Sequence, residues 1–143
     1  MQDPVNIIER EEIKTILPHR EPMLLVDRVE KTAENEATGR YTVKGDEWFL
    51  QGHFPENPVV PGVILCEIMA QSCCVLLADT IKGHTPYFTG LNNVKFRKKV
   101  FPGDVIEVKC NLTNQKPPFY FAVGKSYVNG QLVAGAEFSF MVT

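Results

Sequence analysis

Several signatures that identify common classes of protein are missing from this sequence of 143 residues. It has no serine in a nucleophile elbow, no glycine-rich phosphate loop and no cysteines and histidines at metal-ligand spacing. Its 15 lysines and arginines do not outnumber its 17 aspartates and glutamates, so it lacks the basic excess of a nucleic-acid-binding protein. The start, MQDPVNIIEREEIK, lacks the basic and apolar parts of a signal peptide. We therefore expect a cytoplasmic protein without a metal or another cofactor, and without a nucleic-acid partner.

The four cysteines also lack the C-x-x-C spacing of metal and redox sites: they are Cys66, Cys73, Cys74 and Cys110. Free, buried thiols in a reducing compartment are the better interpretation. The rest of the composition, with 44% hydrophobic and 22% charged residues and a net charge of −2, is ordinary for a globular protein. Without internal repeats or low-complexity segments, the length fits one domain that spans residues 1–143.

The stretch around which the chain is organised reads GHFPENPVVPGVILCEIMAQSCCVLLAD. A proline at the first helical position is pre-organised by its fixed φ, so the pattern predicts a helix from about Pro61 to Lys82. This helix is apolar on nearly every side, which is typical of a helix that is buried on all faces. A membrane span is the competing interpretation, but Glu67, Gln71 and Asp79 interrupt the run. An acidic residue near the centre of a span costs ~2.5–3.5 kcal/mol, so we expect no membrane span.

A carboxylate inside a core helix is costly unless it has a partner or a function. Glu67 either pairs with a buried arginine or lysine, or takes part in chemistry. The nearby His53, on an irregular corner just before the helix, favours chemistry.

A histidine and a glutamate at the start of a helix suit one class of reaction. Unpaired N–H groups at the helix start polarise a carbonyl, and Gly62 has no side chain to keep a ligand oxygen away from its N–H. A neutral histidine accepts a proton, and a glutamic acid donates one. Elimination next to a carbonyl needs these three groups, which remove the α-proton, hold the enolate oxygen and protonate the leaving hydroxyl.

The run GHFPENPVVPGVILCEIMAQ resembles the signature of FabZ-type 3-hydroxyacyl-[acyl-carrier-protein] dehydratases, which have the hotdog fold. The resemblance implies that His53 and Glu67 form the catalytic pair and that the Gly62 N–H binds the thioester carbonyl. It also implies that the pair is completed across a homodimer interface, with a trimer of dimers as the expected assembly. The related FabA branch has aspartate at the acid position, so Glu67 places this chain nearer to FabZ. Gln71, one turn on, is a candidate to hold Glu67 or a water molecule.

Outside this helix the sequence predicts one short helix and a series of strands. Asn6 and Glu9 form a weak capping-box pattern for a helix that ends near Leu17. Asp46 is positioned to cap a single turn, and Asn129-Gly130 marks a type I′ hairpin. The expected strands cover residues 23–26, 38–44, 87–96, 104–113, 119–128 and 131–142. A sheet wrapped around one buried helix satisfies this inventory, which makes the fold class α+β.

Two further groups of residues have a functional and a structural interpretation. His19 lies on a turn between two prolines without a partner that the sequence identifies, so we assign it a structural hydrogen-bonding role. Arg97, Lys98 and Lys99 are either a solvated strand end or a landing patch for an acidic partner. The partner that the resemblance implies, an acyl carrier protein with a phosphopantetheine-linked acyl chain, is acidic.

The predicted function is therefore dehydration of a (3R)-3-hydroxyacyl carrier-protein thioester to the trans-2-enoyl product, in fatty acid synthesis. A hotdog thioesterase, in which the helix carboxylate activates water, is the alternative within the same fold. A non-catalytic module that binds acyl chains is the alternative from another class. The GHFP corner favours the dehydratase, because neither alternative needs a base opposite the helix carboxylate.

Overall fold

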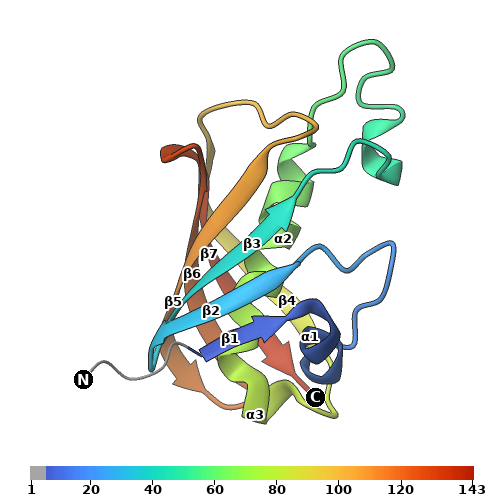
Figure 1. The fold of residues 1–143 in the computed structure, drawn as a ribbon. Helices are drawn as coiled ribbons and strands as arrows, with labels where there is room; N and C mark the ends of the chain where they lie inside the picture. The colour runs from blue at the N-terminus through green and yellow to red at the C-terminus, as the bar shows by residue number, and fades with distance from the viewer. Residues whose placement is uncertain (1–5) are drawn as a thin grey trace, which may run out of the picture.

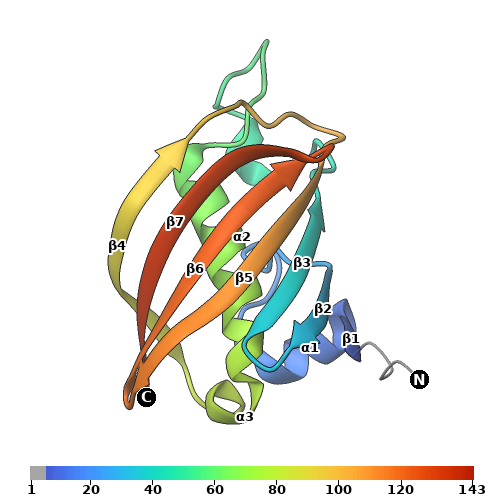
Figure 2. The ribbon, with the colours of Figure 1, turned by 90° about the vertical axis from the view of Figure 1, so that its left-hand side faces the viewer.

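A computed structural model describes residues 6–143 of the chain as one curved antiparallel sheet around a central helix (Figures 1 and 2). Residues 1–5, part of the stretch that lacks signal-peptide features, lie outside the described residues. The sheet has seven strands in the order β1-β2-β3-β5-β6-β7-β4. The strands are β1 Asn6–Glu9, β2 Arg28–Ala33, β3 Glu36–Thr42, β4 Pro86–Phe96, β5 Val105–Lys116, β6 Phe119–Val128 and β7 Gln131–Val142. The hotdog fold and the α+β class are confirmed.

The central helix runs along the concave face of the sheet (Figure 2). It consists of α2 Gly62–Cys74, a 3₁₀ turn η2 Val75–Leu77 and a last turn α3 Ala78–Ile81, close to the predicted range. By length and composition it could cross a membrane, but 67% of its most apolar window is buried inside the molecule. It packs against β3, β5, β6 and β7, so it is the core helix of this sheet.

Small residues on the concave face let the helix approach the sheet closely. A methyl group added at Gly39 in β3 would lie 2.4 Å from the Ser72 Oγ atom. One added at Gly124 in β6 would lie 3.1 Å from the Cβ atom of Met69. A side chain at Gly39 would force Ser72 to shift, and one at Gly124 would require Met69 to move by a few tenths of an ångström, so both glycines favour close packing of helix and sheet.

Two predicted elements are wrong. Asn6–Glu9 is a strand rather than the start of a helix, and α1 covers only Arg10–Ile16. Ile8 pairs with Val29 of β2 and is 6% exposed, and this burial outweighs the capping-box pattern.

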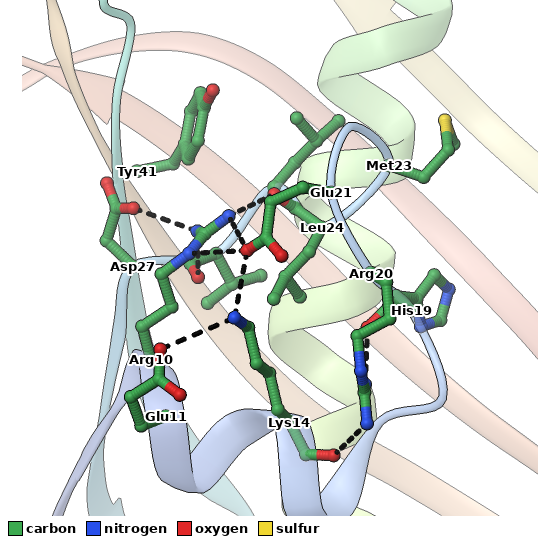
Figure 3. A network of polar contacts seen from close by, with 12 residues as sticks. Arg10, Glu11, Lys14, His19, Arg20, Glu21, Met23, Leu24, Asp27 and Tyr41 are labelled. Atoms are coloured by element: carbon green, nitrogen blue, oxygen red, sulfur yellow. Dashed lines mark hydrogen bonds and ion pairs between the residues drawn. The ribbon is translucent and has the colours of Figure 1, made fainter.

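The second wrong element is the strand predicted at residues 23–26. Leu24, Leu25 and Val26 are buried as predicted, but their backbone lies in an irregular segment. Side chains satisfy the backbone groups that a neighbouring strand would otherwise bind. The Arg10 guanidinium donates to the Leu24 and Val26 carbonyls at 3.0 Å (Figure 3). The Gln71 amide of α2 also binds this segment, at the Met23 carbonyl and the Leu25 N–H.

The same loop is held by charged groups along its outer side (Figure 3). Arg10 pairs with Glu21 and with Asp27, both at 3.1 Å, and Lys14 pairs with Glu21 at 3.2 Å. The Glu21 backbone N–H and the neighbouring Lys14 and Arg10 lower the pKa of the Glu21 carboxyl to about 2. A loop without regular structure is therefore fixed against the core helix.

The predicted cap at Asp46 is also wrong. The short 3₁₀ helix η1, Trp48–Leu50, follows Glu47, and it is the Glu47 carboxylate that holds the corner. It accepts hydrogen bonds from the Tyr41 hydroxyl at 2.6 Å and from the backbone N–H groups of Lys44 and Gly45 at 2.9 and 2.7 Å. This corner leads directly to the segment that carries His53.

Candidate active site

The predicted site residues lie in two separate concavities of the chain. One is an open groove of about 510 Å³ at the N-terminal end of α2, where the β4–β5 connection and the segment after η1 also lie (Figure 1). Its lining includes His53, Gly62, Arg97, Lys98 and Lys99. The other is a smaller pocket of about 70 Å³ beside the middle of α2, lined by polar and apolar side chains. It contains Glu67 and Gln71.

In the groove, one hydrogen bond sets the protonation pattern of His53. The Nδ1 atom lies 2.9 Å from the Val59 carbonyl oxygen. A carbonyl oxygen only accepts hydrogen bonds, so Nδ1 carries the hydrogen in this contact. The neutral ring then has its lone pair on Nε2. Phe54 stacks on the same ring with centroids 4.3 Å apart, which restrains its orientation. The ring is therefore held as a base with Nε2 free to accept a proton.

Gly62 is the first residue of α2 and follows Pro61, which has an extended backbone and no capping side chain. The first intrahelical bonds to Pro61 come from Ile64 and Leu65, so the Gly62 N–H binds no acceptor among residues 6–143. A methyl group at this position would lie 2.8 Å from the Phe96 ring. The exposed Phe96 therefore packs directly over a glycine whose N–H points to the helix start. This arrangement leaves one backbone donor for a ligand oxygen.

The basic cluster Arg97-Lys98-Lys99 lies at the rim of the same groove. The three side chains are exposed, and no carboxylate in residues 6–143 lies within ion-pair distance of any of them. Only Lys98 has a side-chain partner there, the Gln131 amide oxygen at 2.5 Å. Three cations without counter-charges next to His53 give the groove a positive rim.

In the smaller pocket, Gln71 holds Glu67. The Gln71 Nε2 atom donates to Glu67 Oε2 at 2.8 Å and to the Met23 carbonyl at 2.7 Å. Its Oε1 atom accepts from the Leu25 N–H at 2.8 Å. Because that N–H needs an oxygen partner, the amide has only one possible orientation. Gln71 is 1% exposed, so this fixed amide joins the acid candidate to the loop at residues 23–26.

The sequence interpretation missed the proximity of His19 to Glu67. Its Nε2 atom lies 3.7 Å from Glu67 Oε2, and its side chain lines the same pocket. The structural hydrogen-bonding role assigned to it is wrong, because Nδ1 is buried and has no hydrogen-bond partner in the described part of the chain. The two residues are 48 positions apart, so no local sequence pattern connects them. The nearest cation-capable group to Glu67 is thus a histidine rather than a buried arginine or lysine.

A single chain therefore does not bring His53 and Glu67 into one cavity. His53, Gly62 and the basic cluster share the groove, whereas Glu67, Gln71 and His19 share the pocket. Within residues 6–143 no three histidine, cysteine or acidic side chains gather as metal ligands. Each chain therefore carries both members of the predicted pair, but at two different places.

Comparisons with known proteins identify the family to which the chain belongs. Residues 17–137 match the family model described as a FabA-like domain. The chain is 43% identical over 134 residues to the 3-hydroxyacyl-[acyl-carrier-protein] dehydratase FabZ of Clostridium botulinum strain Loch Maree, covering 92% of this chain and 93% of that protein. It is 42% identical to the FabZ dehydratase of Clostridium tetani, covering 92% of this chain and 94% of that protein.

Solved structures share the fold at lower identity. The dehydratase heterocomplex ApeI:P from Xenorhabdus doucetiae matches with a TM-score of 0.79 and 22% identity, over 92% of this chain and 90% of that chain. The PaaI protein of Escherichia coli matches with a TM-score of 0.62 and 14% identity, over 79% and 80% of the two chains. These two solved structures are a dehydratase complex and a protein from a phenylacetic acid degradation operon, whereas the two sequence relatives above are both FabZ dehydratases. The chain belongs to the FabZ-type 3-hydroxyacyl-[acyl-carrier-protein] dehydratases, a family of hydro-lyases within the FabA-like group.

Proposed function

We propose that this member of the FabZ family dehydrates (3R)-3-hydroxyacyl carrier-protein thioesters to trans-2-enoyl thioesters, with His53 and Glu67 as the reacting pair. The observation that carries the residue assignment is the bond from His53 Nδ1 to the Val59 carbonyl. It leaves Nε2 unprotonated in the groove that also contains the free Gly62 N–H. A base and an oxyanion donor in one groove are what removal of a proton next to a thioester carbonyl requires.

The proposed reaction has three coupled proton and electron movements. His53 Nε2 takes the proton from C2, while the Gly62 N–H stabilises the negative charge that develops on the thioester oxygen. The C3–O bond breaks, and Glu67 in its acid form gives its proton to the departing hydroxyl, which leaves as water. The double bond forms between C2 and C3. The elimination neither oxidises nor reduces the substrate, so the proposed reaction needs no redox cofactor.

The two halves of the site meet if two chains associate. The edge strand β4 offers an unpaired sheet edge, and its large apolar side chains are exposed in the single chain, including Tyr87 at 54%, Leu91 at 45% and Phe96 at 52%. Apolar exposure of this extent on one strand favours a partner. We propose a homodimer in which His53 of one chain faces Glu67 of the other. A trimer of such dimers remains the expectation for the full assembly.

The proposed substrate carrier is an acyl carrier protein, which fits the positive rim of the groove. Arg97, Lys98 and Lys99 flank the entrance that leads to His53. An acidic carrier would be attracted to this rim, and its phosphopantetheine arm would enter the groove. A cytoplasmic location is part of the same proposal.

One assay separates the proposed activity from both alternatives. The purified protein is incubated with crotonyl thioester, and hydration is followed by loss of enoyl absorbance while free thiol is measured in parallel. The dehydratase hydrates the double bond without releasing thiol, because elimination is reversible. Release of thiol would identify a thioesterase, and binding without either change would identify a non-catalytic module.

Mixing two inactive variants tests the shared site. His53→Ala and Glu67→Gln should each lose most activity, on the order of 10²–10⁴-fold, since each removes one acid–base group. A mixed dimer contains one site with both substitutions and one with neither. After subunit exchange the mixture should regain up to a quarter of wild-type activity, because random pairing makes about half of the dimers mixed. Mixed dimers that form and stay inactive would contradict a pair completed between chains.

A further inference from the structure

The acid half of the site contains a group that the proposed reaction has not used. His19 belongs to the loop between α1 and β2, and Arg10 and Arg20 tie this loop to neighbouring backbone groups (Figure 3). Its imidazole reaches the pocket wall, where Nε2 lies 3.7 Å from Glu67 Oε2. This separation is longer than a hydrogen bond. Bonds between catalytic groups are often long without substrate and shorten in the complex with substrate.

The two nitrogen donors near Glu67 converge on the same oxygen. Gln71 already donates to Oε2 at 2.8 Å, and the orientation of its amide is fixed by the Leu25 N–H. His19 Nε2 approaches Oε2 as well. A carboxylic acid has one hydroxyl oxygen and one carbonyl-type oxygen, and N–H donors favour the carbonyl-type oxygen. Two donors on Oε2 therefore leave the acidic proton on Oε1.

The buried Nδ1 atom of His19 decides which tautomer the ring adopts. It has no hydrogen-bond partner within residues 6–143. A buried N–H without an acceptor is rarer and more costly than a buried lone pair. The neutral ring therefore carries its hydrogen on Nε2, toward Glu67, and its lone pair on Nδ1.

We propose that His19 is a positioning residue for the acid: its neutral ring donates Nε2–H to Glu67 Oε2 beside Gln71, so that Oε1 is the oxygen that delivers the proton. This inference rests on the proposed role of Glu67 in dehydration. In this proposal His19 acts on the substrate only through Glu67. It also explains a buried imidazole whose other nitrogen has no partner.

The surroundings of His19 keep it neutral near pH 7. Burial lowers the pKa of His19 below its ordinary value of 6.5, the Glu67 carboxylate opposes this effect, and Arg20 on the same loop adds to it. Cys74 on α2 is the other titratable group of the pocket, and burial raises the pKa of its thiol, so it stays uncharged. The strands β4 and β7 contribute only the uncharged Pro86, Phe88 and Phe140.

Protonation of His19 would work against proton delivery by Glu67. An imidazolium beside Glu67 favours the carboxylate over the acid, and the carboxylate has no proton to give. Activity should therefore fall in acid as His19 takes up a proton, and this loss adds to any loss that does not depend on His19. The acid limb of log kcat against pH should then be steeper than a single protonation allows.

The test compares His19→Leu with His19→Gln. Leucine keeps apolar bulk but has no donor, so kcat should fall about 10- to 100-fold with little change in KM, the effect of a displaced acid. Glutamine keeps a donor near the position of Nε2 but cannot be protonated. It should retain kcat within about threefold at neutral pH, as expected when the donor is preserved, and its acid limb should reduce to a single protonation.

His84→Gln is the matched control, because His84 is an exposed histidine in the loop before β4. It should leave both kcat and the pH profile unchanged. Urea denaturation of both His19 variants should match the wild type, which separates positioning of the acid from support of the loop. A His19→Leu enzyme with wild-type kcat would overturn the inference, and so would a His19→Gln enzyme with the wild-type acid limb.

A second readout does not depend on activity. In protein labelled with ¹⁵N-histidine, long-range ¹H–¹⁵N spectra distinguish the two neutral tautomers, and His19→Gln assigns the His19 signals. The inference requires hydrogen on Nε2 and a shift of that nitrogen in Glu67→Ala. Hydrogen on Nδ1 would overturn it. If the wild type lacked dehydratase activity, the proposed function would fail, whereas an active wild type with the wrong tautomer would refute only the role of His19.

Discussion

At the scale of single residues, the Glu47 carboxylate holds the corner that leads to His53, although Glu47 itself does not line the groove. Its three hydrogen bonds fix the corner between β3 and η1, from which the chain continues to His53. Burial alone would raise the pKa of Glu47, but the bonds from the Tyr41 hydroxyl and from the Lys44 and Gly45 N–H groups outweigh it and lower the pKa. The carboxylate form therefore stabilises the fold.

Because folding lowers the pKa of Glu47, its contribution to stability depends on pH. A group whose pKa is lower in the folded chain contributes stability above its unfolded value, which is near 4.5, and this contribution is lost as pH falls through the folded value. Glu47→Gln should lower the free energy of unfolding at pH 7 by about 1–2 kcal/mol, allowing for partial exposure to solvent. The difference from wild type should shrink below about pH 4.

Urea denaturation between pH 7 and pH 3.5, at one protein concentration, measures this effect. Glu34→Gln is the control, because the Glu34 carboxylate is exposed and makes no side-chain hydrogen bond or ion pair among residues 6–143. A constant deficit of Glu47→Gln at every pH would show that the loss comes from packing rather than from charge.

At the scale of elements, the fit between α2 and the sheet depends on Gly39. Its missing side chain lets Ser72 lie against the backbone of β3, where an added methyl would be 2.6 Å from the Ser72 Cβ atom. Glu67 and Gln71 belong to the same helix, so a shift of α2 would displace the acid half of the proposed site.

Gly39→Ala should therefore destabilise the protein by about 1–3 kcal/mol through overpacking. Adding Ser72→Gly should restore part of the loss, because the two side chains compete for one space, and the double-mutant cycle should give a coupling of about 0.5–3 kcal/mol. Gly135→Ala in β7 is the matched control, since its new methyl would meet its nearest atom at an ordinary 3.7 Å. Thermal denaturation measures all four variants. Additive effects of Gly39→Ala and Ser72→Gly would show that this contact does not set the spacing.

The elements also show what the sequence predicts well. β6 and β7 have the predicted bounds, and Asn129 and Gly130 have the positive φ values of 51° and 77° that a type I′ turn needs. The signals here are local: alternation and turn residues. The segment at residues 23–26 was predicted wrongly because its partners are the distant side chains of Arg10 and Gln71. The contact of His19 with Glu67 escaped prediction for the same reason. The motif supplied the candidate site residues, whereas their separation into two cavities could be seen only in the fold.

At the scale of the whole molecule, charge is distributed unevenly. The chain has a net charge of −2, yet the rim of the groove has three cations without ion-pair partners among residues 6–143. Exposed charges act mainly by long-range attraction, which salt screens beyond ~8 Å at physiological ionic strength.

Neutral substitutions at Arg97, Lys98 and Lys99 should therefore lower kcat/KM for a carrier-protein substrate by about 10-fold or more at low salt. A short N-acetylcysteamine thioester, which brings no acidic carrier, should be used as well as by wild type. Added salt should reduce the wild-type preference for the carrier substrate, and the variant should respond less. Lys31, Lys82 and Lys116, three exposed lysines outside the groove lining, provide a charge-matched control set.

Two results would contradict this prediction. Equal loss with both substrates would mean that the cluster supports the groove itself. No loss with either would leave the three residues as a solvated strand end.

The exposed edge strand β4 has a consequence for how this protein can change over evolutionary time. An unpaired strand with apolar side chains is a template for aggregation as long as a newly made chain is alone. A lysine at Leu91 would protect the solitary chain, because charge on an edge strand opposes unwanted pairing. If the proposed dimer covers Leu91, the same lysine would oppose association, because burying a charge without a partner is costly. A charge at this position would then be expected to trade protection of the single chain against assembly of the proposed site.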